Sequence, residues 1–152
     1  MELKNLKRKL LSDIKFRSIQ KSDLDQVYPL LNQLKELDYN SINKEKAWNN
    51  FFNNTSANSI VGILDNKVIA YGSVIIENKI RGDIAGHIED IVVDKNVRKR
   101  MVGVYLIKEL IKICKNKKCY RITLFCKEEL IKFYSRNGFE VNNIMMKKFL
   151  NN

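Results

Sequence analysis

The sequence has little of several features that mark particular classes of protein. Its 152 residues include three cysteines, one proline, one histidine and six glycines. The longest apolar runs are only a few residues, far short of the roughly 18 needed to cross a bilayer. We therefore expect no transmembrane segment. The Lys-rich start is not followed by an apolar stretch of roughly 7–15 residues, which argues against a secretory signal.

The cysteines argue against disulfides and metal binding. Cys114, Cys119 and Cys126 are odd in number and form no C-x-x-C pair. A secreted disulfide framework normally uses an even number of cysteines, so we expect reduced thiols and a cytoplasmic protein. We expect no metal site, because His87, the only histidine, lies far from the cysteines in the sequence.

The charge is strongly positive. The 28 Lys plus Arg and 17 Asp plus Glu residues give a formal net charge of +11. This surplus is compatible with nucleic acid, a membrane surface or a small anionic ligand. Most basic residues are scattered, and aromatic residues are not interleaved with them as nucleic-acid binding usually requires. Denser basic groups occur at Lys7-Arg8-Lys9, Arg98-Lys99-Arg100 and residues 115–118.

The chain is organised as one domain. Its length and its 45% content of hydrophobic residues suit a single core, and no internal repeat or linker divides it. We expect an N-terminal extension over residues 1–13, whose leucines have helical spacing, followed by a single domain over residues 14–150.

Hydrophobic periodicity predicts the order β-α-α-β-β-β-α-β-α-β. The predicted strands cover residues 14–19, 59–64, 67–77, 86–94, 119–126 and 139–150. The predicted helices cover residues 24–37, 43–53, 100–116 and 128–136.

Turn residues and connections refine this prediction. Asp65-Asn66 predicts a tight hairpin turn, and Asn137-Gly138 predicts a left-handed helix stop. The strand–helix–strand unit over residues 86–126 predicts one parallel pair in an otherwise antiparallel sheet. The expected fold class is therefore α+β (mixed α/β), with a central mixed, mostly antiparallel sheet flanked by helices.

The segment after the strand at 86–94 has features of an anion site. A helix N-terminus presents backbone N–H groups and a partial positive charge, and the three adjacent cations at 98–100 would strengthen that field. Gly103 is the only glycine there, so the segment is not a nucleotide-binding loop of the glycine-rich kind. The alternative interpretation is a solvated basic loop.

Five segments have a characteristic order and spacing. They are Gly86-His87-Ile88-Glu89-Asp90-Ile91-Val92-Val93, Arg98 to Gly103, Cys119-Tyr120-Arg121-Ile122, Lys132-Phe133-Tyr134 and Asn137-Gly138-Phe139. Together they resemble the glucosamine-6-phosphate N-acetyltransferase family of the GNAT superfamily, over about residues 14–149. The resemblance implies the GNAT acyl-CoA N-acyltransferase fold. It also implies transfer of acetyl from acetyl-CoA to the 2-amino group of D-glucosamine 6-phosphate, for UDP-GlcNAc biosynthesis.

The resemblance implies two segments that bind acetyl-CoA. The backbone of Ile91, Val92 and Val93 would pair with the pantetheine arm, and an N–H there would polarise the thioester carbonyl. The pyrophosphate would lie at Arg98, Lys99, Arg100, Met101, Val102, Gly103 and Val104. Met101 stands where the family motif has its inner glycine, so we expect a shifted or weakened contact.

The resemblance also implies the catalytic residues. Tyr134 would protonate the departing sulfur, and Glu89 and Asp90 would orient the amine and accept its proton through water. Adjacent residues on a regular strand point to opposite faces, so both carboxylates would meet the substrate only on a bulged strand. Phe125 stands where the family has Asp. The base is therefore open between Glu89, Asp90, a backbone carbonyl and water.

Further implications concern the phosphate and the assembly. Lys79, Tyr120 and Arg121 would bind the sugar phosphate, because a guanidinium suits bidentate phosphate binding. The family's active sites are shared across a homodimer, so Lys147 or Lys148 would reach the partner's site. His87 is expected to be structural. Alternatives are a GNAT enzyme for another amine, such as a polyamine or a protein N-terminus, and a non-catalytic CoA- or nucleic-acid-binding protein of the same fold.

Overall fold

The computed structural model describes residues 13–97 and 101–150. Its strands are β1 (Lys15–Ser18), β2 (Ala57–Leu64), β3 (Lys67–Asn78), β4 (Ile84–Val93) and β5 (Arg121–Leu124). Its α-helices are α2 (Leu24–Asn32), α3 (Lys44–Phe52), α4 (Val102–Asn116) and α5 (Ile131–Ser135), with short 3-10 turns at Lys21–Asp23 and Glu128–Leu130.

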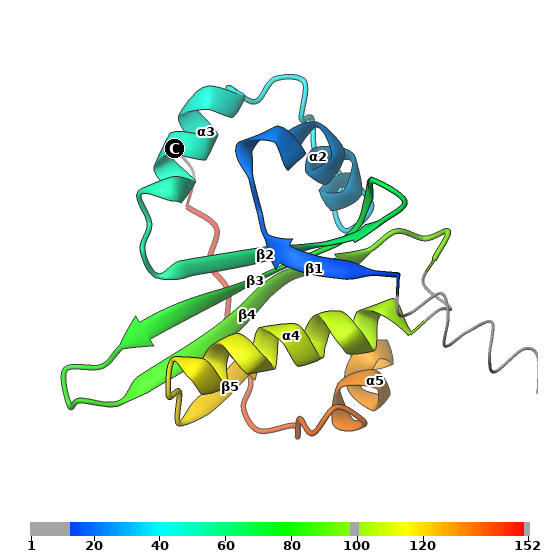
Figure 1. Cartoon of the computed structure of the whole chain (residues 1–152). Coiled ribbons are helices and arrows are strands. Elements are labelled where there is room, and N and C mark those ends of the chain that lie inside the picture. The colour runs from blue at the N-terminus through cyan, green and yellow to red at the C-terminus, as the bar shows by residue number, and fades with distance from the viewer. Residues whose placement is uncertain (1–12, 98–100, 151–152) are drawn as a thin grey trace, which may run out of the picture.

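The strands form one five-stranded sheet in the order β1-β2-β3-β4-β5. The first three pairs are antiparallel, and β4 pairs with β5 in parallel through the crossover helix α4. Helices α2 and α3 lie on one side of the sheet, and α4 covers the other (Figure 1). The predicted mixed, mostly antiparallel sheet is confirmed.

The turn between β2 and β3 follows from its sequence. Asp65 and Asn66 have φ values of 49° and 62°. Two successive positive φ values give the turn that matches the twist of paired strands, and Asp and Asn tolerate this conformation better than most residues. The predicted hairpin is therefore confirmed.

The core has two parts, one on each face of the sheet. On one face of the sheet, Val27 and Leu30 of α2 pack against Val61 of β2 and Tyr71 of β3. On the other face, Leu106 and Leu110 of α4 are fully buried at the centre of a larger cluster. Apolar side chains at three- and four-residue spacing explain why α4 has one buried stripe.

Helix α2 is shorter than predicted. The pattern of leucines predicts a helix to residue 37, but α2 ends at Asn32. The side chain of Asn32 accepts a hydrogen bond from the Leu37 backbone N–H at 2.7 Å, which satisfies a group in the following turn. Leu34 is 47% exposed, so its position in the pattern does not reflect packing.

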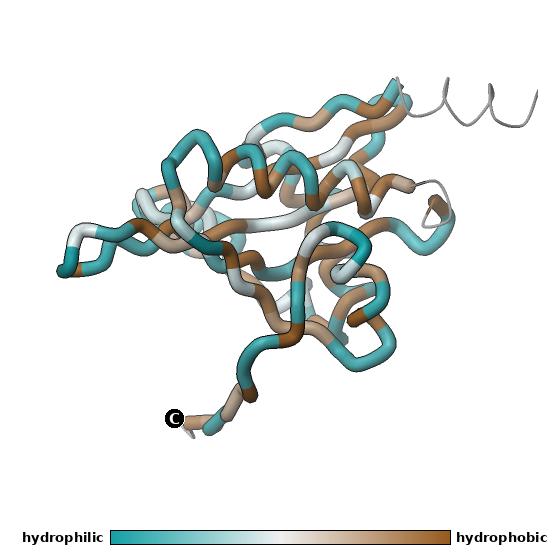
Figure 2. Tube along the Cα trace, turned by 90° about the horizontal axis from the view of Figure 1, so that it is seen from below, coloured by the Kyte–Doolittle hydropathy of each residue, from teal (hydrophilic) through white to brown (hydrophobic). Residues whose placement is uncertain are grey.

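The predicted strand over residues 139–150 is wrong for the single chain. The segment has no regular secondary structure and all its residues except Phe139 are exposed. Figure 2 shows the C-terminal end standing clear of the body. A strand requires hydrogen bonds from a neighbouring strand, and none is recorded for this segment among the described residues.

Two further expectations concern the N-terminal extension and membrane-spanning segments. The N-terminal extension at residues 1–12 lies outside the described residues. Within the described ranges, no helix is both long and apolar enough to cross a membrane.

An ion pair joins β1 to the start of α2. Arg17 donates two hydrogen bonds to the Asp23 carboxylate, at 2.6 and 2.8 Å, and the Gln20 backbone N–H donates a third at 2.7 Å. Asp23 is only 5% exposed. The hydrogen bonds from Arg17, followed by the one from Gln20, hold the pKa of Asp23 below its ordinary value despite the cost of burial.

Replacing Asp23 by Asn is expected to lower the free energy of unfolding by about 1–3 kcal/mol near neutral pH. Because the folded-state pKa of Asp23 is lowered, this stabilisation is present above the unfolded pKa of about 3.9 and is lost as the pH falls through the folded value. Urea unfolding of both proteins at about pH 7 and about pH 3 measures the difference. A difference that does not shrink in acid would contradict the assignment.

Candidate active site

The site begins at a β-bulge between β3 and β4. Tyr71 pairs with Val92 and Ser73 pairs with Glu89, so β4 contains one more residue than β3 over this interval. Asp90 has a φ of 52° within the bulge. A bulge places two residues opposite one and turns the local side-chain direction. The regular alternation that would separate Glu89 from Asp90 is therefore interrupted here.

The bulged carboxylates face the α2 side of the sheet. Glu89 lies opposite Ser73, whose hydroxyl accepts a hydrogen bond from Ser59 at 2.7 Å, and Tyr71 donates to Ser59 at 3.1 Å. Burial raises the pKa of the Tyr71 phenol, and the nearby charge of Asp90 raises it further. Both carboxylates thus lie next to one buried chain of hydroxyls.

Asp90 has an altered acidity. Part of its side chain is open to solvent, but protein atoms remove enough hydration from the carboxyl to raise its pKa. The like charge of neighbouring Glu89 adds to this increase. Carboxyls with a raised pKa are better proton acceptors than ordinary ones, which is typical of sites for acid–base chemistry.

The parallel strands β4 and β5 separate next to the bulge. Their pairing ends at Ile88 and Leu124, whereas β4 continues to Val93. The segment Ile91–Val93 therefore runs beyond β5, at the point where α4 begins its crossover. The sheet is therefore open on this side of β4.

The start of α4 has an unusual backbone. Met101 precedes the helix with φ 63° and ψ 6°, in the left-handed region, and its side chain is 54% exposed. At Gly103, an added Cβ would lie 3.4 Å from the Phe133 ring. The cations Arg98, Lys99 and Arg100 lie outside the described residues.

Met101→Gly is expected to raise the free energy of unfolding by up to about 1 kcal/mol. A left-handed conformation costs an L-residue roughly 1–2 kcal/mol, and part of this is offset by the greater flexibility of glycine in the unfolded chain. Lys108→Gly, at an exposed position inside α4, is the matched control and should lower it by about 1 kcal/mol. Urea unfolding tests both, and equal losses would show that Met101 is unstrained.

Tyr134 lies in an aromatic cluster on α5. Its ring packs edge-on against Phe133 and Phe139, at centroid distances of 5.0 and 6.0 Å, and the residue is 7% exposed. Burial, with a smaller contribution from Cys126, raises the pKa of Tyr134 to about 12. The phenol therefore remains a proton donor throughout the neutral and mildly alkaline range.

The predicted phosphate residues gather at the other end of β4. Arg121 lies with its guanidinium 5.2 Å from the Tyr120 ring centroid, and Lys79 pairs with Glu77 at 2.6 Å. Arg81 donates a hydrogen bond to the Tyr120 hydroxyl at 2.7 Å. It therefore belongs to this cluster, although the sequence did not predict it as a site residue; the basic character of its loop is the signal that could have indicated it.

The described chain does not bring this cluster to the carboxylates. Arg121 pairs with Ala85, which is four residues before Glu89 on β4. At ~3.3 Å per residue this corresponds to ~13 Å along the strand. Lys147 and Lys148 lie in the exposed C-terminal segment.

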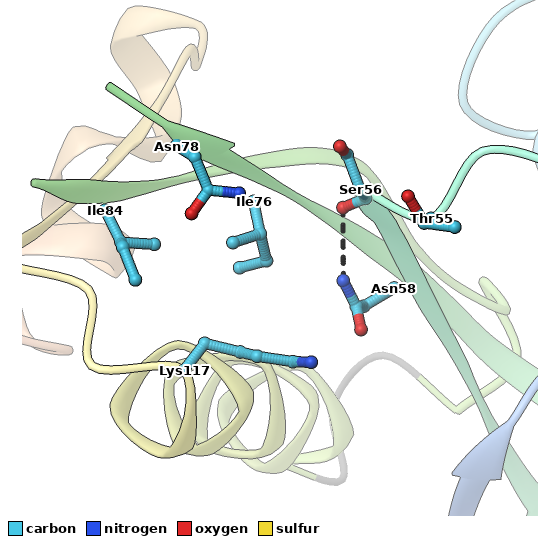
Figure 3. Close-up of a pocket in the computed structure, with 7 residues that line it drawn as sticks. All are labelled: Thr55, Ser56, Asn58, Ile76, Asn78, Ile84 and Lys117. Carbon is cyan, nitrogen blue, oxygen red and sulfur yellow. Dashed lines mark hydrogen bonds between the residues drawn. The ribbon is translucent and has the colours of Figure 1, made fainter. Parts of the chain in front are cut away.

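A small hollow lies elsewhere, where the sheet extends beyond the end of α4 (Figure 3). Its volume is about 230 Å³, and none of the residues predicted for the site lines it. The lining residues are Thr55, Ser56, Asn58, Ile76, Asn78, Ile84 and Lys117. Among the described residues, no group of three or more His, Cys, Asp or Glu side chains could hold a metal ion.

Comparison with known proteins identifies the family. Residues 24–139 match the acetyltransferase (GNAT) family. The chain is 33% identical over 143 residues to glucosamine 6-phosphate N-acetyltransferase 1 of Dictyostelium discoideum, covering 90% of this chain and 91% of that protein. It is 39% identical over 85 residues to the enzyme of that name from Arabidopsis thaliana, covering 55% and 57% of the two chains.

Solved structures agree with the sequence comparison. The crystal structure of glucosamine-6-phosphate N-acetyltransferase from Arabidopsis thaliana superposes with a TM-score of 0.83 at 30% identity, over 91% of this chain and 99% of that one. An acetyltransferase of Trypanosoma brucei gives the same TM-score at 27% identity, over 91% and 100%. The GNAT fold is confirmed, and the chain belongs to the glucosamine 6-phosphate N-acetyltransferase family within the GNAT family.

Proposed function

We propose that this protein transfers acetyl from acetyl-CoA to the 2-amino group of D-glucosamine 6-phosphate, giving N-acetyl-D-glucosamine 6-phosphate and CoA. The observation that carries this proposal is the similarity to a glucosamine 6-phosphate N-acetyltransferase over 90% of the chain. The product would serve UDP-GlcNAc biosynthesis in the cytoplasm. The bulged pair of carboxylates on β4 supports an acceptor that is an amine.

Acetyl-CoA fits the open side of the sheet. The backbone of Ile91 and Val92, beyond the end of β5, would pair with the pantetheine arm, and an N–H there would stabilise negative charge on the thioester oxygen. The N-terminus of α4, from Met101 through Val104, would face the pyrophosphate with its partial positive charge. Arg98, Lys99 and Arg100 precede this helix in sequence and would add opposite charge.

The chemistry requires two further tasks of the protein, one at the amine and one at the departing sulfur. An amine attacks a thioester only as the free base, so Glu89 and Asp90 would orient the amino group and take its proton through water. The attacking nitrogen forms its bond to the carbonyl carbon, and the C–S bond then breaks. Tyr134, kept protonated by its buried position, would donate a hydrogen bond or proton to the departing sulfur.

The sugar phosphate would bind to the basic cluster. Arg121 with Tyr120 offers a guanidinium held over an aromatic ring, and Lys79 adds a second cation. Because this cluster is ~13 Å from Glu89 along β4 in one chain, a site complete in both carboxylates and phosphate ligands would draw on two chains.

We therefore propose a homodimer in which the C-terminal segment pairs with the partner. Val141, Ile144, Met146 and Phe149 are 75–94% exposed, an unusual number of apolar side chains for a short segment in water. Strand pairing with a second copy would bury them and bring Lys147 or Lys148 to the partner's site. Sedimentation of the full chain at micromolar concentration should give twice the mass of 17.8 kDa. A monomer would contradict the dimer.

The test of function is acetyl transfer by the purified full-length protein to four amines: glucosamine 6-phosphate, glucosamine, spermidine and a peptide amine. CoA and acetyl-CoA are separated by chromatography, because the exposed thiol of Cys126 would react with a thiol reagent. The sugar phosphate should be at least about tenfold better than glucosamine in kcat/KM, the value of one well-placed charged contact.

The other outcomes point elsewhere. Preference for spermidine or the peptide would indicate another acceptor amine. Acetyl-CoA binding without turnover on any amine would overturn the proposed reaction and indicate a binding protein of the same fold.

A further inference from the structure

The single histidine of the chain has a defined place beside the carboxylates. His87 lies on β4 two residues before Glu89 and opposite Ile75 of β3. Its side chain is 24% exposed, and its ring packs at 4.8 Å against Phe125, which follows the last residue of β5. The imidazole therefore lies between Phe125 and Glu89, and part of it remains open to solvent.

One neighbour of His87 bears on which ring nitrogen carries the proton. The Thr123 hydroxyl is 3.5 Å from the Gly86 carbonyl oxygen, to which it donates. The Thr123 Oγ1 atom is 2.8 Å from Nδ1 of His87. A hydroxyl proton directed to Gly86 makes Thr123 an acceptor from His87, and the ring proton then lies on Nδ1, which is the tautomer that a basic Nε2 requires. The other nitrogen, Nε2, then presents a lone pair.

A carboxylate lies beside Nε2. Nε2 of His87 is 3.4 Å from Oε1 of Glu89. Two acceptors at this distance repel each other, but a proton on Nε2 converts the repulsion into attraction. Three other neighbours carry no charge, namely Ile75 on β3, Thr123 on β5 and Phe125 after the end of β5. Among the contacts of the described residues, Glu89 is thus the titratable group that meets the imidazole.

We propose that Nε2 of His87 is the proton acceptor for the attacking amine, with Glu89 stabilising the resulting imidazolium. As the amine nitrogen bonds to the thioester carbonyl carbon, its proton moves to Nε2. The C–S bond breaks, and the sulfur takes a proton from Tyr134. His87 then releases its proton to water, and Tyr134 regains one from water. This inference rests on the proposed acetyl transfer and assigns to the imidazole the step that the two carboxylates were given above.

The test compares His87→Gln and His87→Asn in full-length protein. The Gln amide can still reach Glu89 and the Asn amide can still reach Thr123, but neither binds a proton near neutral pH. Both variants should lose about 10²-fold in kcat with glucosamine 6-phosphate. Their pH profiles between about pH 6 and about pH 9 should also differ in shape from the profile of the parent protein.

Two further measurements separate catalysis from a structural role. Added imidazole should restore part of the activity of His87→Ala, in proportion to the concentration of its free base, because a small base can enter the vacated space. Nitrogen NMR of the parent protein reports one imidazole only and should show the Nδ1–H tautomer, which Thr123→Val should disturb. Lys35→Gln, at an exposed position on the turn after α2, is the control and should keep the parent profile.

The outcomes distinguish this inference from the proposed function. A parent protein that acetylates glucosamine 6-phosphate, with His87→Gln retaining its rate and pH profile, would overturn the role of His87 alone. Loss of activity in every His87 variant without any rescue by imidazole, and with an Nε2–H tautomer in the parent, would also overturn it. A parent protein inactive on all amines would overturn both.

Discussion

Tyr134→Phe is expected to lower kcat about 10²-fold or more, with the KM for acetyl-CoA nearly unchanged. The substitution removes only the phenolic oxygen, so the packing of the ring against Phe133 and Phe139 is retained. Without that donor, the sulfur must leave as a poorly stabilised thiolate. Initial rates at saturating glucosamine 6-phosphate, with CoA separated by chromatography, measure the effect.

The pH dependence gives this prediction a second readout. Because burial raises the pKa of Tyr134 to about 12, the phenol stays protonated as the pH rises through the range in which an ordinary tyrosine begins to ionise. The parent profile should therefore show no fall due to Tyr134 below about pH 10. Tyr39→Phe, outside the proposed site, is the matched control. A kcat for Tyr134→Phe equal to that of this control would remove Tyr134 from the mechanism.

Leu110→Ala is expected to lower the free energy of unfolding by about 2–5 kcal/mol, the largest change in stability that we predict. Leu110 is fully buried under the sheet, where its Cδ1 atom lies 2.9 Å from the position of a Cβ at Gly72. Truncation removes packed atoms and leaves a cavity between α4 and β3. Urea unfolding measures the loss, and Leu34→Ala, at a position 47% exposed, should change stability by less than about 0.5 kcal/mol.

A double-mutant cycle sharpens the argument. Gly72→Ala alone should cost about 1–3 kcal/mol, because the new methyl group meets Leu110 and Leu106. In the Leu110→Ala background the same change should cost less, since the nearest atom is gone, with a coupling of at least about 0.5 kcal/mol. Additive losses would show that Gly72 and Leu110 do not share this space. Gly72 lies opposite the bulge, so the cycle also tests what holds Glu89 and Asp90 in place.

Local sequence determined much of the architecture. The positive φ values of Asp65 and Asn66 and of Gly138 follow from residues that tolerate such backbone, and both turns are predicted correctly. The apolar stripe of α4 predicts its buried face. The segment from Gly86 to Val93, together with the later segments in their order and spacing, indicates the family, which the comparisons confirm.

Tertiary pairing decided what periodicity could not. The segment over residues 139–150 is predicted as a strand, but a strand exists only where a neighbouring strand supplies hydrogen bonds, and this segment pairs with no strand among the described residues. For the same reason β5 is shorter than predicted, because it pairs with β4 only from Arg121 to Leu124.

The site itself was only partly determined by sequence. The sequence identifies Glu89 and Asp90, but whether they share a face depends on the register between β3 and β4, which is a property of two segments together. Thr123 of β5 lies beside the His87 ring, so the surroundings of this imidazole could not be read from β4 alone. Local propensity fixes turns and faces, whereas the chemistry of a side chain depends on atoms distant in sequence, which only the folded chain brings within hydrogen-bonding range.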